Sequence, residues 1–163
     1  MIVFVGAWVS PALRNRWEFN LYLRIFGTNE KTVSELEWSK ANGAVFVKWL
    51  PNIQDINPAD ERDVAYYNKL VELDLPLLTH VGDEDSFSKT NNALGDPRLL
   101  HLALKCGVRV IAAHVASSGT SDAQDNVERL LEMMPQYPNL MADLSTLTQF
   151  NRSRHFPKVL NDA

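Results

Sequence analysis

The sequence predicts an α/β fold with a parallel sheet, because short β-rich runs alternate with segments of helical periodicity. The last four of these runs begin 31, 33 and 32 residues apart, which is about the length of one strand–helix unit. Three of them, AVFVKW, PLLTH and VRVIAAH, are apolar on both faces, as parallel strands covered by helices should be. The five runs begin near Ile2, Ala44, Leu75, Val108 and Leu140.

Helices are expected between these strands, where caps and breakers bound the periodic segments. The spacing of apolar residues, with proline or aspartate near the starts and glycine or proline after the ends, predicts four of them: Lys31–Asn42, Pro58–Leu73, a segment from Asp96-Pro97 to Gly107, and about Ser121 to Met134. A further segment, Arg14–Ile25, has aromatic residues at mixed spacing and is interpreted either as a helix or as a capping insertion.

Two architectures fit alternating strands and helices: an open doubly wound sheet or a (β/α)8 barrel. An open sheet usually binds a nucleotide through a Gly-rich first turn, and the sequence contains neither GxGxxG nor GxxxxGK[ST]. A complete barrel needs ~250 residues, whereas 163 residues supply roughly five units. We therefore predict a single domain over residues 1–163, built as a partial (β/α)8 barrel of about five β/α units.

The composition excludes several classes of partner. A net charge of −4 without a basic run gives no surface for nucleic acid, and no apolar run approaches the ~20 residues of a membrane span. The single cysteine, Cys106, allows no internal disulfide and is expected to be a buried small residue. These features favour a cytoplasmic protein acting on a small-molecule substrate.

Three polar side chains close three of the predicted strands. Lys48, His80 and His114 follow one another at intervals of 32 and 34 residues. Because the carboxyl ends of parallel strands meet at one edge, these side chains are expected to converge. The two imidazoles then suit a metal site, although histidines at a sheet edge can also serve only as hydrogen-bonding groups. Lys48 is expected either to pair with a carboxylate such as Glu84 or to be carboxylated to a carbamate.

Further polar residues lie in the loops after these strands and are candidates for contact with a substrate. Asp143 follows the last strand, where it faces the pocket or hydrogen-bonds a neighbouring loop. Arg152 either holds a substrate carboxylate through its guanidinium fork or is a surface arginine. His101 and His155 are expected to be non-catalytic. The substrate-contact candidates are Asp83, Glu84, Ser117 and Arg152.

Four phrases carry a resemblance to a known family. GAVFVKWLPNIQDINP, LPLLTHVGDEDSF, VRVIAAHVASSG and NLMADLSTLTQFNR, in this order between Gly43 and Arg152, resemble the amidohydrolase superfamily, in its amidohydrolase-related branch of TIM-barrel metal-dependent hydrolases. The resemblance implies that His80 and His114 are the metal ligands that end the fifth and sixth barrel strands. It places Lys48 where some members have a carboxylated lysine on the fourth strand.

The resemblance also identifies parts that have no counterpart here. The HxH strand at the start of the barrel and the strand that ends in an aspartate base are absent from the sequence, and Asp143 lies one strand too early to replace that aspartate. The chain is thus expected to supply strands three to seven, either as part of a longer gene product or as a truncated homologue. Tight metal binding is in question, because catalytic zinc normally has three protein ligands.

The implied function is a metal-dependent hydrolase in which a divalent metal, expected to be zinc, activates a water that attacks a C–N, C–O or lactone bond. Nonoxidative decarboxylation on the same scaffold is an alternative. A second alternative is a catalytically dead structural or interaction module, so we leave open whether the chain is an enzyme. In that case the open sheet edges at Ile2–Ala7 and Leu140–Leu144 would bind partners, including a second copy of the chain.

Overall fold

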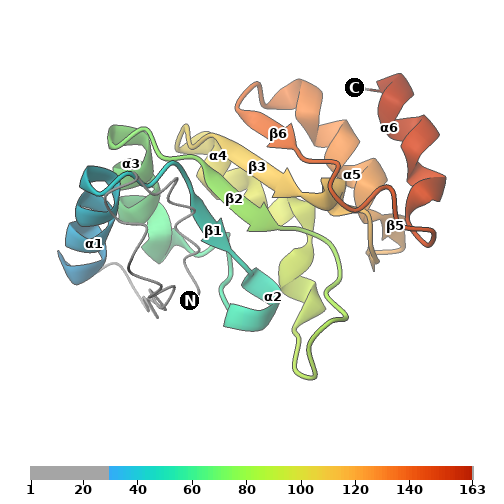
Figure 1. Ribbon diagram of the computed structural model, residues 1–163, viewed down its shortest axis with the longest axis horizontal. Coiled ribbons are helices and arrows are strands. Elements are labelled where there is room, and N and C mark those ends of the chain that lie inside the picture. The colour runs from blue at the N-terminus through green and yellow to red at the C-terminus, as the bar shows by residue number, and fades with distance from the viewer. Residues whose placement is uncertain (1–29, 163) are drawn as a thin grey trace, which may run out of the picture.

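A four-stranded parallel sheet forms the centre of the computed structural model, which describes residues 30–162. Its strands lie in the order β1-β2-β3-β6 (Figure 1). The α/β class and the parallel sheet are therefore confirmed, and four of the predicted strands are present. The run at Ile2 and the segment Arg14–Ile25 lie outside the described residues. The strands span Val47–Trp49 (β1), Leu77–His80 (β2), Val110–Ala113 (β3) and Leu140–Ala142 (β6).

Helices connect these strands and agree in part with the predicted segments. The helix predicted over Lys31–Asn42 is confirmed as α1, and α4 ends just before Gly107, whose φ of 89° makes it a natural helix stop. The α-helices span Glu30–Ala41 (α1), Pro51–Gln54 (α2), Val64–Glu72 (α3), His101–Lys105 (α4), Asn126–Met133 (α5) and Phe156–Asp162 (α6). Short 3-10 helices span Glu61–Asp63 (η2), Asn92–Gly95 (η3), Pro97–Leu100 (η4), His114–Ala116 (η5), Met134–Gln136 (η6) and Ser153–His155 (η7).

Two predicted helix starts are wrong. The helix expected from Pro58 begins later, because Asp60 rather than Asn57 caps it by accepting a hydrogen bond of 2.9 Å from the amide of Arg62. The helix expected from Ser121 is preceded by a hairpin of β4 (Thr120–Ser121) and β5 (Gln124–Asp125). The two residues between these strands have φ of 47° and 62°, as a tight two-residue hairpin turn requires.

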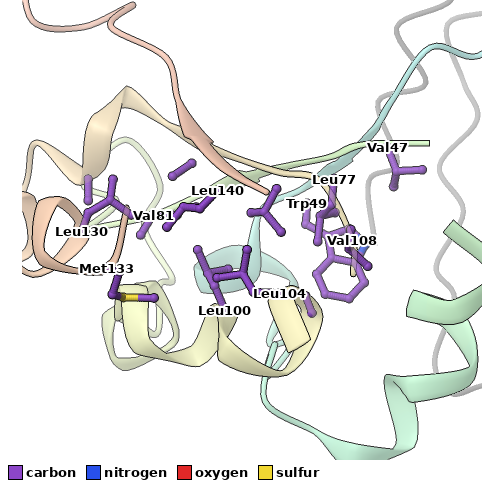
Figure 2. Packing of buried hydrophobic residues seen from close by; sticks show 14 of the residues in the cluster. Val47, Trp49, Leu77, Val81, Leu100, Leu104, Val108, Leu130, Met133 and Leu140 are labelled. Atoms are coloured by element: carbon purple, nitrogen blue, oxygen red, sulfur yellow. The ribbon is translucent and has the colours of Figure 1, made fainter. Parts of the chain in front are cut away.

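The hydrophobic core lies on one face of the sheet. Alternate strand residues such as Val47, Leu77 and Val110 are fully buried, and Figure 2 shows the labelled side chains gathered between the strands and the helices. Trp49 of β1 stacks on Tyr66 of α3 with ring centroids 5.3 Å apart, which fixes that helix against the edge of the sheet. Burying such aromatic side chains contributes a large share of the stability of a small domain.

The opposite face of the sheet carries a different row of side chains. The strand register places Lys48 beside Leu78, Leu78 beside Ile111 and Ile111 beside Met141. The first three are half-buried and Met141 is 41% exposed. Lys48, a candidate residue of the metal site, thus belongs to the less buried face. Within residues 30–162, every helix is too short or too polar to span a lipid bilayer.

Candidate functional site

Two histidines meet at the carboxyl edge of the sheet. His80 is the last residue of β2, and its register partner on β3 is Ala113, directly before His114. The two imidazole rings lie with centroids 5.5 Å apart and planes at 65°, in an edge-to-face contact. The regular spacing of the strands therefore brings together residues 34 positions apart in the chain, as the sequence predicts.

The position of His114 depends on an unusual backbone turn. In an extended strand His114 would share the face of Ala112, which is fully buried on the helix side. Instead His114, Val115 and Ala116 have φ of 63°, 48° and 52°, so three residues in succession adopt the left-handed conformation. This conformation costs roughly 1–2 kcal/mol per non-glycine residue. The turn redirects the imidazole towards His80.

Contacts between the loops after β2 and β3 hold the turn in place. The amide of Asp83 donates to the carbonyl of Ser118 at 3.1 Å, and the Ser118 hydroxyl donates to the carbonyl of Asp83 at 2.8 Å. Gly82 makes this approach possible, because a Cβ there would lie 2.7 Å from the Ser118 carbonyl oxygen. The two histidine-bearing loops therefore form one unit.

Each imidazole has a carboxylate beside its Nδ1 atom. The Glu84 Oε2 atom lies 3.8 Å from His80 Nδ1, and the Asp143 Oδ1 atom lies 3.8 Å from His114 Nδ1. His114 Nδ1 is also 2.7 Å from the hydroxyl oxygen of Ser145. Metal-binding histidines commonly have such partners, because they fix the ring and its proton and leave Nε2 to coordinate.

The two imidazoles also have the charge state that metal coordination requires. Burial lowers the pKa of His80 to about 4 and also lowers the pKa of His114. Both imidazoles are therefore neutral at pH 7, as a metal ligand must be. His80 Nε2 makes only a long contact of 3.4 Å with the carbonyl oxygen of Asp83, and within the described residues His114 Nε2 has no hydrogen-bond partner.

Lys48 contributes an ammonium group that loses its proton more readily than that of an ordinary lysine. Burial lowers the pKa of the Lys48 ammonium to about 8, and the charges of Asp143 and Glu84 oppose that shift. The charge of Lys48 in turn lowers the pKa of both His80 and His114, so the lysine belongs to the same electrostatic cluster. The two histidines thus converge as expected, and Lys48 acts on both of them through its charge.

The substrate-contact candidates have different environments. Glu84 lies in the cluster; burial acts to raise its pKa, but hydrogen bonds from Ser86 and the nearby charge of Arg152 together lower it. Asp83, its neighbour, places its carboxyl group against Gly119, where a Cβ would lie 2.1 Å from the Asp83 Cγ atom. Ser117 is buried, with its hydroxyl 3.1 Å from that of Thr146 and 3.3 Å from Arg152 Nη1. The Asp83 side chain therefore lies apart from the cluster that contains Glu84.

The sequence predicted the role of Asp143 only in part and did not predict that of Ser145. Asp143 was expected either to face the pocket or to hydrogen-bond a neighbouring loop; its carboxylate lies near His114 and accepts a hydrogen bond of 2.9 Å from the amide of Ser145 in its own loop. The position of Asp143 directly after a strand was the signal that could have found it. Nothing in the sequence singles out Ser145, whose contact with His114 depends on loop geometry.

A divalent metal fits part of this arrangement. His80 and His114 offer two imidazole ligands, and the Ser145 hydroxyl oxygen, 2.7 Å from His114 Nδ1, orients the second ring. Glu84 and Asp143 face the two Nδ1 atoms, and no set of three or more His, Cys, Asp or Glu side chains in residues 30–162 is arranged to hold a metal ion. The described residues therefore fit two positions of a metal site rather than a closed coordination shell.

Comparisons with known proteins do not extend this description: no protein-family model, no curated protein and no solved structure matches the chain. Fold and site alone define its class, an α/β protein with a parallel sheet and a histidine pair at the carboxyl edge of that sheet. Ligands in open parallel sheets and barrels bind at this edge.

Proposed function

We propose that the chain forms the central strands of a (β/α)8 barrel and that His80 and His114 hold a divalent metal, zinc, in a hydrolase of the amidohydrolase type. The observation that carries the proposal is the histidine pair itself: two neutral imidazoles 5.5 Å apart, each with a carboxylate beside Nδ1. A pair that served only to close the sheet edge would not need both carboxylates.

The metal, when bound, would lower the pKa of a water so that hydroxide attacks a C–N, C–O or lactone bond. His80 and His114 would coordinate through Nε2. Glu84, and Asp143 together with Ser145, would keep the proton on each Nδ1 atom. Hydrolysis is preferred to decarboxylation because a hydroxide nucleophile needs only the metal and a proton acceptor.

Lys48 has one of two roles in this proposal. As an ammonium it would stabilise negative charge developing on a substrate oxygen. As a neutral amine, which its lowered pKa of about 8 makes accessible, it would react with carbon dioxide to give a carbamate ligand. A carbamate would raise the number of protein ligands from two to three, the usual number in catalytic zinc sites.

The metal content of the purified full chain tests the proposal. We expect stoichiometric zinc in the wild-type chain and its loss in the His80→Ala/His114→Ala variant. A matched control removes the two other histidines, His101→Ala/His155→Ala; His101 contacts Tyr137 rather than the cluster. Circular dichroism checks that each variant is folded. If the wild-type chain binds no metal, the proposal fails and the inert interaction module is supported.

A further inference from the structure

Arg152 joins the two loops that follow β3 and β6. Its Nη1 atom donates to the Ser117 hydroxyl at 3.3 Å and lies 3.5 Å from the Thr146 hydroxyl, and those two hydroxyls are 3.1 Å apart. Both partners are neutral. One end of the guanidinium is thus held in a fixed orientation without its charge being neutralised.

The other edge of the guanidinium lacks an acceptor. The Nε atom of Arg152 is buried without a hydrogen-bond partner, and no carboxylate in residues 30–162 forms an ion pair with this arginine. Two more exposed arginines, Arg98 and Arg109, differ from Arg152 because each forms an ion pair with a carboxylate. A buried donor left unpaired is destabilising, so an acceptor supplied by a ligand would recover this energy.

Arg152 lies close to the histidine pair. Its partner Thr146 directly follows Ser145, whose hydroxyl oxygen is 2.7 Å from His114 Nδ1. The cluster contains two positively charged groups, Lys48 and Arg152, and two negatively charged groups, Glu84 and Asp143. With neutral histidines the cluster has no surplus positive charge, which disfavours a dianion.

We infer that the substrate of this site carries a carboxylate group and that Arg152 binds it through the Nε–Nη2 edge. A carboxylate is a planar monoanion whose two oxygens match the two parallel donors of this edge. Ser117 and Thr146 are positioning residues that hold Nη1. The inference deepens the proposed hydrolase and rests on it for the reaction, although the anion site itself does not need a metal.

The test uses the full chain, treated with a chelator, and follows the backbone amide signals of Ser117 and Ser145, which every variant keeps, by NMR during a titration with benzoate. Benzamide has the same shape without the charge and serves as the control ligand. We expect a saturable shift with benzoate only. Arg152→Gln should weaken benzoate binding at least about tenfold, the usual effect of removing a charge-assisted pair of hydrogen bonds. Arg109→Gln, at an exposed arginine paired with Asp74, should leave binding unchanged.

A second variant covers the case in which Arg152→Gln does not fold. Thr146→Val keeps the guanidinium but removes one of its two hydroxyl contacts, and it should weaken benzoate binding several-fold. Equal binding of benzoate by the wild type and the Arg152 variant would overturn the inference, as would binding of inorganic phosphate without benzoate. Zinc without benzoate binding would reject only the carboxylate; benzoate binding without zinc would reject only the hydrolase.

Discussion

Gly82 and Gly95 lie in direct backbone contact beneath the loop that follows His80. The amide of Gly82 donates to the carbonyl of Gly95 at 2.8 Å, and a Cβ on Gly95 would lie 2.1 Å from the carbonyl oxygen of Gly82. The same carbonyl accepts a hydrogen bond of 3.0 Å from the amide group of Asn52. This contact fixes the start of the segment that carries Asp83 and Glu84.

Gly95→Ala should therefore destabilise the chain through a clash with backbone that cannot move aside. We expect a loss of about 3 kcal/mol or more in the free energy of unfolding, at the upper end of overpacking effects. Urea denaturation measures it. Gly43→Ala is the matched control, because Gly43 has a φ of 91° but no atom within 4 Å of its Cβ position, so only about 1–2 kcal/mol of backbone strain is expected. Equal losses would contradict the steric account.

Asp63 should make the chain less stable as the pH rises. Burial, with a smaller contribution from Asp60, raises the pKa of Asp63 from 3.8 to about 6. The native state then holds this proton more tightly than the unfolded state. The contribution of Asp63 to the free energy of unfolding is greatest below pH 4. It falls by at most about 3 kcal/mol as the pH rises through 6. Asp63→Asn should remove this loss and stabilise the chain at pH 7 in urea denaturation.

The neighbouring Asp60 provides a control of opposite sign. Hydrogen bonds from Arg62 lower the pKa of Asp60 to about 2, so its charged form is favoured in the native state. Asp60→Asn should make the chain less stable at pH 7, and the difference from wild type should disappear as the pH falls through 2. Stabilisation by both substitutions would show that net charge, rather than burial, governs this segment.

Lys48 should titrate near pH 8 in the chelator-treated chain. Burial lowers its pKa, while Asp143 and Glu84 act against that shift. Asp143→Asn should consequently lower the pKa of Lys48 further, whereas Glu132→Gln on α5 should not change it. NMR of the lysine Cε–Hε signals against pH measures this. A Lys48 midpoint near 10.5, its ordinary value, would place the amine in solvent.

The two faces of the sheet should respond differently to truncation. Leu77→Ala removes a fully buried side chain and should cost about 2–5 kcal/mol. Leu78→Ala, one residue later on the half-buried face, should cost less than half as much. Urea denaturation of both variants compares them directly. A larger loss for Leu78 would mean that this face is the main core.

The outer edge of the sheet should mediate self-association. Among the described residues β6 pairs only with β3, and Met141 within it is 41% exposed. Unpaired edges of this kind bind other strands. Light scattering should detect a concentration-dependent oligomer that Met141→Lys reduces. A monodisperse monomer at all concentrations would contradict this expectation.

Much of the fold and part of the site follow from local chemistry. Gly107 ends α4 as its position predicts, and the even spacing of strand starts is enough to bring His80 and His114 to the same edge of the sheet, since parallel strands in register end together. The α/β class follows from the same repeat. The number of residues per unit also motivates the barrel, which remains part of the proposal.

The remaining features depend on contacts between distant segments. Helical periodicity continues through Asp122 and Ala123, so the hairpin there has no sequence signal; neither residue is the glycine that such turns favour. Asp83 and Glu84 are adjacent in sequence, yet only the carboxylate of Glu84 lies beside His80, because Gly119 leaves room for the Asp83 carboxyl group in another direction. Neither outcome can be inferred from residue types alone.

The left-handed turn at His114, Val115 and Ala116 has a consequence for protein design. Histidines placed at the ends of two adjacent strands in another α/β scaffold would not reproduce this pair, because a regular backbone would point the second ring into the core. A successful graft would have to transfer residues 113–119 together with the Gly82 loop that braces them. The unit to transfer is thus a pair of interlocked loops rather than the two imidazoles alone.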